Sequence, residues 1–338
     1  MPRLDHYWNT VNGLSIALLP LSLLFSLVAG FRRLAYRIGL LHIRRFPLPV
    51  LVVGNITVGG TGKTPLVTWL ADHLRSQGWR PGIVSRGYGG SARHWPQQVR
   101  ADSDPATVGD EAVMLAALTA CPMCVGPDRP AAVEALLQHT DVNIVISDDG
   151  LQHYALARDL EIAVLDGERR LGNGFLLPAG PLREPKTRLR SVDLVVVNGQ
   201  AEEGEFSMEL HQPSVRPLTG GEAMDLSRFS GAPVNAVAGI GNPQRFFDLL
   251  GRHAIDVRPH PYPDHHAFEA GDLAFDDDLP ILMTETDAVK CRRLPCRNCW
   301  VVHVDAQPNA GFVQRLNTAL EEFVDGQEAA GHPGLPDL

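Results

Sequence analysis

Short apolar runs alternate with amphipathic stretches along residues 46–200. The runs are rich in Val, Ile and Leu, as is typical of parallel strands that are buried on both faces. Strands are expected at 48–53, 82–85, 142–147, 161–165 and 192–197. Helical patterns at 64–77 and 109–119 lie between some of them. This alternation predicts an α/β core with a doubly wound, mostly parallel sheet.

A second, smaller α/β domain is expected at residues 222–325. Apolar runs at 234–239, 279–284 and 300–304 predict its strands, and Asn242-Pro243 predicts the start of a helix. Residues 201–221, rich in Gly, Glu and Pro, are interpreted as a linker or a β-ribbon. Residues 326–338 are interpreted as a flexible C-terminal tail.

The N-terminal segment, residues 1–45, contains a long uncharged stretch. Residues 13–30 carry no charge and are rich in leucine, and Arg32 and Arg33 follow. As a helix the stretch would span about 27 Å, close to the thickness of a hydrocarbon core. A cleaved signal peptide is disfavoured, because the positive charges follow the apolar stretch. A buried core helix is the alternative to the preferred interpretation, a membrane-associated helix whose flanking arginines favour the cytoplasmic side.

Charge is distributed unevenly along the 338 residues. The net charge of −9 argues against general nucleic-acid binding, because a surface that follows phosphates needs an excess of basic residues. No Asp or Glu occurs from His6 through Ala71, whereas five arginines occur there. The cationic N-terminal part is therefore expected to meet an anionic surface.

The five cysteines include two C-x-x-C pairs, Cys121/Cys124 and Cys296/Cys299. Zinc sites use this spacing, but the pairs lie far apart in different predicted domains. An odd number of cysteines favours reduced thiols over disulfides.

Residues 54–65 form a glycine-rich turn directly after an apolar run, which is the pattern of a phosphate-binding P-loop. Lys63 is expected to reach the β- and γ-phosphates of ATP, and Thr64 to hold Mg²⁺. The loop is a variant, because Thr57 occupies a position where the strict pattern has Gly. A glycine-rich turn without a ligand is the alternative. The nucleotide-binding residues are expected to be Thr57, Val58, Gly59, Gly60, Thr61, Gly62, Lys63 and Thr64.

Two acidic segments are candidates for the chemistry. The apolar run 142–147 leads into Asp148 and Asp149, as in a Walker B element whose carboxylate reaches Mg²⁺. An ordinary Asp-Gly turn is the alternative. Asp110 opens a predicted helix, where it acts either as a cap or as the carboxylate that takes a proton from an acceptor hydroxyl.

Further polar groups follow predicted strands or lie in the second domain. His265 is preferred over the adjacent His266 as a residue that tunes a carboxylate across a cleft, since neighbouring side chains point in different directions. A metal site and a solvated loop are the alternatives for this Asp-His-His segment. Arg86, Tyr88 and Arg183 are expected to line the cleft, and Glu184 to support Mg²⁺.

These segments together resemble the tetraacyldisaccharide 4′-kinase family of lipid A biosynthesis. The matching strings lie at 53–65, 85–90, 109–111, 148–153, 176–185, 264–266 and 284–290. Thr57 agrees with the family, which has a small hydroxyl residue there, whereas relatives usually have Lys where this chain has Thr286.

The resemblance implies ATP-dependent phosphorylation of the 4′-hydroxyl of a lipid A disaccharide 1-phosphate at the cytoplasmic face of the bacterial inner membrane. It implies a proton-accepting dyad of Asp110 and His265, and a metal site served by Thr64, Asp148, Asp149 and Glu184. Membrane lipids are expected to contact the N-terminal helix. No protein partner can be inferred.

Two other functions are consistent with a P-loop. A membrane-associated NTPase would use hydrolysis to drive a partner protein. A membrane-tethered binding module would retain the loop only as a fold element. A GTPase is disfavoured, because no Asn-Lys-x-Asp motif occurs.

Overall fold

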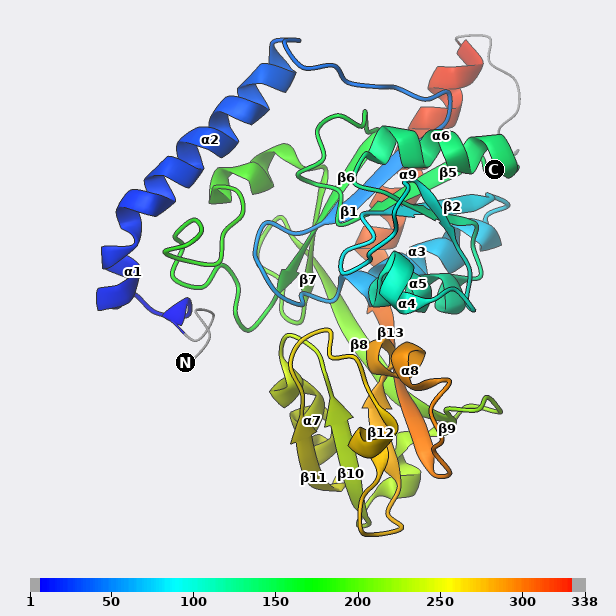
Figure 1. Ribbon diagram of the computed structural model, residues 1–338. Coiled ribbons are helices and arrows are strands. Elements are labelled where there is room, and N and C mark those ends of the chain that lie inside the picture. The colour runs from blue at the N-terminus through cyan, green and yellow to red at the C-terminus, as the bar shows by residue number, and fades with distance from the viewer. Residues whose placement is uncertain (1–6, 330–338) are drawn as a thin grey trace.

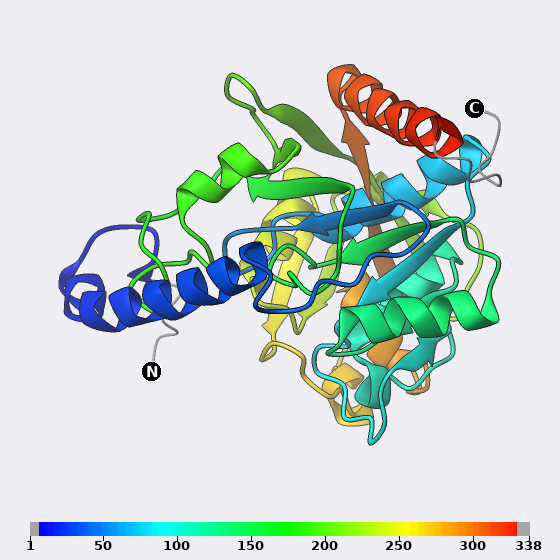
Figure 2. The ribbon, with the colours of Figure 1, turned by 90° about the horizontal axis from the view of Figure 1, so that it is seen from above.

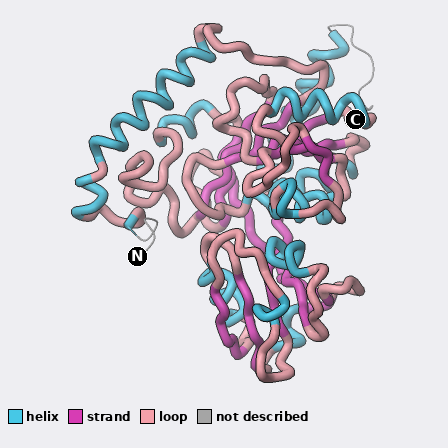
Figure 3. The backbone as a smooth tube through the Cα atoms, in the orientation of Figure 1, coloured by secondary structure: helices cyan, strands magenta, loops and turns pink. Residues whose placement is uncertain are grey.

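One continuous sheet runs through both lobes of the molecule (Figures 1 and 3). The computed structural model describes residues 7–329. The strand order is β11-β10-β12-β13-β8-β7-β6-β1-β5-β2-β4-β3, with β9 paired to β8. The strands from β7 to β4 in this order belong to the first lobe and those from β11 to β12 to the second, so β8 and β13 connect the two.

The first lobe is the predicted doubly wound core. Its strands from β7 to β4 are parallel, and β3 runs antiparallel at the edge. Alternate residues of β1 point to opposite faces: Leu51 and Val53 pack with α3, α5 and α9, and Val50 and Val52 pack with α6. The elements are β1 (Val50–Gly54), α3 (Lys63–Ser76), β2 (Pro81–Ser85), β3 (Gln97–Val99), α4 (Pro105–Val108), α5 (Asp110–Thr119), β4 (Met123–Val125), α6 (Arg129–His139), β5 (Ile144–Asp148), β6 (Leu160–Asp166) and β7 (Leu194–Asn198). The predicted strands and helices of this core are confirmed.

The second lobe is the smaller α/β unit below the core in Figure 1. Its strands β11, β10, β12 and β13 are mutually parallel, and α7 packs on them through Phe246, Phe247 and Leu250. The elements are β10 (Pro233–Ala238), α7 (Pro243–Arg252), β11 (Asp256–Pro261), β12 (Ile281–Thr284), α8 (Glu285–Cys291) and β13 (Cys299–Pro308). Three short 3₁₀ helices complete the described residues of the two lobes: Lys186–Ser191, Leu226–Phe229 and Ala270–Leu273.

The segment 201–221, interpreted as a linker or a β-ribbon, contains the long strand β8. β8 (Phe206–Pro217) pairs in parallel with β7 and in antiparallel with β13 along most of its length, and β9 (Met224–Asp225) pairs with its end. The two long strands thus join the lobes through main-chain hydrogen bonds. The pairing of β8 with β13 has a register shift between His303 and Asp305.

The C-terminal residues return to the first lobe. Residues 310–325 were expected in the second domain, but they belong to α9 (Ala310–Ala329). Its residues Phe312, Leu316, Leu320 and Val324 are buried in the core of the first lobe. The tail expected from Gly326 is helical through Ala329, and residues 330–338 lie outside the described residues.

The N-terminal residues form α1 (Gly13–Ala17) and α2 (Leu19–Arg37), so the helical segment is longer than expected. In Figure 2, α2 extends away from the sheet beside the segment that follows β6. Ser22 Oγ donates to the carbonyl of Leu176 at 2.7 Å, which anchors the helix there. Only Ser22 and Ala35 of α2 are buried. The buried core helix is therefore the wrong interpretation, because most of the apolar side chains of α2 face solvent.

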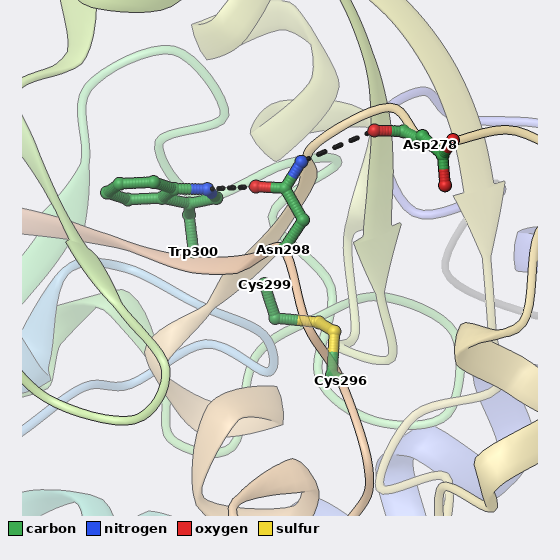
Figure 4. Close-up of a disulfide and its surroundings, with 5 residues drawn as sticks. All are labelled: Asp278, Cys296, Asn298, Cys299 and Trp300. Carbon is green, nitrogen blue, oxygen red and sulfur yellow. Dashed lines mark hydrogen bonds between the residues drawn. A yellow bond between two sulfur atoms is a disulfide. The ribbon is translucent and has the colours of Figure 1, made fainter.

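Cys296 and Cys299 are joined by a disulfide at the start of β13, where reduced thiols were expected (Figure 4). The turn brings their Cα atoms to 5.8 Å, within the normal range for this bond. Cys121, Cys124 and Cys291 are free and buried. Within residues 7–329 there is no group of three metal-ligating side chains around any of them.

Candidate functional site

One cavity of about 2260 Å³ connects the P-loop, the second lobe and α2. Its walls include the carboxyl ends of β5, β6 and β7, where ligands of doubly wound sheets bind. Phe25 and Arg32 of α2 border one side, and His265 and Thr284 of the second lobe border another.

The predicted P-loop connects β1 to α3. Gly59 and Gly62 have φ values of +101° and +95°, which are favourable for glycine. A Cβ atom on Gly62 would in addition lie 2.9 Å from Nδ2 of Asn198, so Gly62 and Asn198 pack closely. The first half of the loop is fixed by the segment before Arg183, because Val58 N donates to the carbonyl of Pro181 at 2.8 Å. All eight expected nucleotide-binding residues line the cavity.

Lys63 and Arg183 converge on Asp149. Nζ of Lys63 lies 3.4 Å from Oδ1 of Asp149, and Arg183 Nη1 donates to Oδ2 at 2.9 Å. Burial alone would raise the pKa of Asp149, but these two cations outweigh it and hold the pKa well below its usual range. Asp149 is therefore ionised at neutral pH and orients both cations beside the loop.

Asp148 and Glu111 form a more negative corner of the cavity. Asp148 is buried and accepts a hydrogen bond from Ser85 Oγ at 3.2 Å, and burial together with the charge of Asp149 raises its pKa. Glu111 lies in the cavity wall, where solvent reaches it but protein surrounds it. This confinement and the charge of Asp148 raise the pKa of Glu111 to about 7. Sequence reasoning missed Glu111, although its place beside Asp110 in a first helical turn was visible.

Asp110 and His265 meet across the boundary between the lobes. Asp110 is the first residue of α5 and is buried, and His265 follows β11 with a φ of +58°. Nδ1 of His265 lies 3.0 and 3.1 Å from the two carboxylate oxygens of Asp110. This hydrogen bond raises the pKa of His265 despite partial burial. His266 points elsewhere: its Nε2 lies 2.9 Å from Asp272 Oδ2, and its ring stacks on Tyr262.

The predicted cleft residues differ in their surroundings. Arg86 and Tyr88 are exposed on the cavity wall. The centre of the Tyr88 ring lies 5.4 Å from the centre of the His265 ring. Thr286 also lines the cavity, and its hydroxyl lies 3.3 Å from the sulfur of Met114.

The geometry does not favour Glu184 as a metal ligand. The side chain is buried, and it accepts hydrogen bonds from Gln152 Nε2 at 2.7 Å and from the hydroxyl of Tyr154. Arg188 Nε lies 3.3 Å from the same carboxylate. Both oxygens of Glu184 are thus engaged by protein groups, which the sequence alone could not show.

Asn198 is a second residue that sequence reasoning missed. It ends β7 beside Gly62, lines the cavity and is 9% exposed. Among the described residues, its buried amide nitrogen has no hydrogen-bond partner. Such a donor at the carboxyl end of a strand beside a P-loop suits an acceptor on a nucleotide.

Comparisons with known proteins identify the family of the chain. Residues 14–321 match the family model of LpxK, tetraacyldisaccharide-1-P 4′-kinase. Curated relatives of that activity include one from Nitrosococcus oceani, 54% identical over 94% of both chains, and one from Azoarcus sp., 49% identical over 98% of both. The crystal structure of LpxK from Aquifex aeolicus in complex with ATP has a TM-score of 0.79 and 27% identity, and the match covers 91% of this chain and 99% of that one. The chain belongs to the tetraacyldisaccharide-1-P 4′-kinase family.

Proposed function

We propose that this protein is a kinase that transfers the γ-phosphoryl group of ATP to the 4′-hydroxyl of a tetraacyldisaccharide 1-phosphate, giving the 1,4′-bisphosphate. The observation that carries the proposal is that the P-loop borders the same cavity as His265, whose ring is hydrogen-bonded to the buried Asp110. A phosphate donor and a proton acceptor on one cavity are what phosphoryl transfer to an alcohol requires. The family assignment and the relative crystallised with ATP support the same activity.

The nucleotide is proposed to bind with its phosphates in the loop 57–64. Backbone N–H groups and the start of α3 would hold the phosphates, and Lys63 would contact the β- and γ-phosphates. Asp149 is proposed to hold Lys63 and Arg183 in place before and during transfer. The free amide of Asn198 would donate to the nucleoside or to the α-phosphate.

The chemistry of the negative corner fits Mg²⁺. Asp148 and Glu111 are carboxylates with raised pKa values, and Thr64 provides a hydroxyl nearby in the cavity wall. Oxygen ligands of this kind are those that Mg²⁺ prefers. We assign the ion to Thr64, Asp148 and Glu111. We leave out Asp149, which pairs with Lys63 and Arg183, and Glu184, whose carboxylate is occupied. When bound, the ion would neutralise charge on the transferring phosphoryl group.

Asp110 and His265 are proposed to act as the proton acceptor for the 4′-hydroxyl. The carboxylate of Asp110 is proposed to take the proton, and Nδ1 of His265 holds and tunes that carboxylate, as a second group orients the base in other catalytic pairs. Tyr88, whose ring lies beside that of His265, and Arg86, which is exposed on the cavity wall, are proposed to contact the acceptor.

The acceptor is proposed to reach the cavity from a membrane that α2 contacts. A lipid with several acyl chains leaves a bilayer at a cost of about 0.8 kcal/mol per methylene, so the enzyme must come to it. α2 is long and apolar enough to cross a membrane, and it borders the cavity. Arg32 and Arg33 would face anionic headgroups, and the catalytic lobes are proposed to lie at the cytoplasmic face of the inner membrane.

A transfer assay tests the proposal directly. The protein is incubated with γ-labelled ATP, Mg²⁺ and the purified tetraacyldisaccharide 1-phosphate in mixed micelles, and the lipid product is isolated. We expect label at the 4′ position of the lipid. ADP release without labelled lipid, at the same rate with and without acceptor, would instead support the NTPase alternative.

A further inference from the structure

A buried ion pair in the second lobe lies behind the Asp110–His265 pair. Asp287 and Lys290 both belong to α8, and their side chains are 0% and 9% exposed. Nζ of Lys290 lies 2.9 Å from Oδ1 of Asp287. Burying two charges costs free energy that their attraction repays only in good geometry, so packing alone is a weak reason for such a pair.

Asp287 fixes the main chain that carries His265. Its Oδ2 accepts hydrogen bonds from the hydroxyl of Thr284 at 2.7 Å and from the N–H of Gly239 at 3.0 Å. The carbonyl of Gly239 in turn accepts the N–H of His265 at 3.1 Å. Because His265 has a φ of +58°, which is uncommon for a residue other than glycine, its conformation has to be held by such neighbours.

Lys290 extends from this pair toward the first lobe. Its Nζ lies 3.6 Å from Oδ2 of Asp110, the oxygen that also faces His265, and 5.1 Å from the ring centre of Phe268. The lysine therefore stands between two carboxylates, one from each lobe. A compact point charge suits this position, because the ammonium group can address both carboxylates.

We propose that Asp287 and Lys290 are positioning residues for the proton-accepting pair. Asp287 fixes the backbone conformation of His265, and Lys290 holds the carboxylate of Asp110 in position against the imidazole ring of His265. Neither residue touches the reacting atoms; both act through Asp110 and His265. This role rests on the proposed function, since it presupposes that the pair accepts the proton.

Steady-state kinetics of Lys290→Met test the role. General base catalysis contributes about 10²- to 10⁴-fold, so misplacing the base is expected to lower kcat by about tenfold or more. The KM values for ATP and for the lipid acceptor should stay within about twofold, because neither binding site is changed. Lys290→Arg, which keeps the charge, should recover part of kcat. An unchanged kcat, or a loss confined to KM, would overturn the proposal.

Two double variants separate positioning from a merely structural role. If Lys290 only neutralises buried Asp287, then Asp287→Asn combined with Lys290→Met should restore kcat; we expect it to stay low. If Lys290 acts through the pair, its replacement in a His265→Ala background should cost much less than in the wild type, because residues that act as a unit are not additive. Full additivity of the two losses would contradict us.

The controls keep this test distinct from that of the proposed function. Lys186→Met removes an exposed lysine outside the cavity wall and should leave kcat unchanged. Thermal unfolding checks that each variant is folded. If Lys290→Met does not fold, the same kinetic measurements are made on Asp287→Asn and Lys290→Gln. Absence of lipid phosphorylation by the wild type would defeat the proposed function, whereas normal kcat in a folded, charge-free variant would defeat only the positioning role.

Discussion

Nδ1 of His265 lies 3.0 Å from Oδ2 of Asp110, although the two residues belong to different lobes. Asp110 begins a helix of the P-loop core, and His265 follows a strand of the smaller lobe. The pair therefore exists only in this arrangement of the lobes, which the long strands β8 and β13 maintain. The P-loop lies wholly within the first lobe, whereas the Asp110–His265 pair needs both lobes.

Replacing the members of this pair should affect kinase activity unequally. Asp110→Ala is expected to remove most activity, because it removes the buried carboxylate that is proposed to take the proton. His265→Ala should cause a smaller loss. His266→Ala is the matched control and should cost least, because its ring contacts Asp272 and Tyr262 instead. The measurement is kcat with ATP and the lipid acceptor, and a larger loss for His266→Ala would reverse this assignment.

The titration of His265 should depend on Asp110. The hydrogen bond to that carboxylate raises the pKa of His265. In Asp110→Asn the negative charge is gone, so the pKa of His265 is expected to fall. NMR of the imidazole ring against pH measures it, with His266 as an internal reference in the same spectra. Equal pKa values of His265 in the two proteins would show that the contact does not persist in solution.

Lys63→Ala should remove most kinase activity while the protein stays folded. The side chain occupies the cavity wall, where its charge is expected to contact the terminal phosphates. Its loss also leaves Asp149 with Arg183 as its cation. Calorimetric titration with ATP and Mg²⁺ should show weakened binding together with the loss of transfer. Near-normal turnover would remove Lys63 from the mechanism.

The free energy of unfolding should depend on pH through His303. The ring lies 2.8 Å from both Glu285 and Asp305, and the hydrogen bond to Glu285 contributes most to raising the pKa of His303 to about 9. A raised pKa in the folded state stabilises it fully below the unfolded value near 6.5, and the contribution is lost as pH rises through about 9. At 1.36 kcal/mol per pKa unit, discounted because Asp305 is exposed, it is on the order of 2 kcal/mol.

Denaturant unfolding of His303→Gln tests this dependence. The variant should be less stable than the wild type at pH 6, and the difference should shrink as the pH approaches 10. A difference that stays constant across this range would mean that the side chain acts by packing rather than by charge.

The sequence predicted the elements whose signal is local. The strands of the first lobe are continuous apolar runs, and the P-loop and the acids after β5 follow directly from the order of residues along the chain. What it missed depends on contacts between distant residues. Glu111 was not singled out, because only the folded chain brings it into one cavity wall with Asp148. For Glu184, expected to serve the metal site, nothing in the order of residues shows that Gln152, Tyr154 and Arg188 contact its carboxylate.

Domain limits were hard to predict for the same reason. Polar and turn-forming residues flank β8 in the sequence. Its partner strand β13 lies about ninety residues later in the chain. The helix α9 is amphipathic, but its apolar face alone does not indicate which lobe the helix packs against. Phe312 and Leu316 settle this by packing against the core around α3.

Association with membranes should depend on the exposed apolar face of α2. Leu23, Leu27 and Phe31 are 63%, 63% and 69% exposed, and nothing in the described residues covers them. Burying a leucine side chain contributes about 2 kcal/mol, so Leu23→Asp with Leu27→Asp should abolish most binding. Flotation with vesicles that contain anionic lipid measures it.

The arginines at the end of α2 provide the electrostatic half of that prediction. Each basic residue near an anionic surface is worth about 1 kcal/mol, so Arg32→Ser with Arg33→Ser should weaken flotation with anionic vesicles. It should leave the weaker binding to neutral vesicles unchanged. Arg75→Ser in α3 is the control, because this exposed arginine pairs with Asp72 far from α2 along the chain. Unaltered flotation of both the aspartate and the serine variants would show that another surface holds the protein to the membrane. Since α2 also borders the cavity, the aspartate variants should in addition lower kcat/KM for acceptor in vesicles more than for acceptor in detergent.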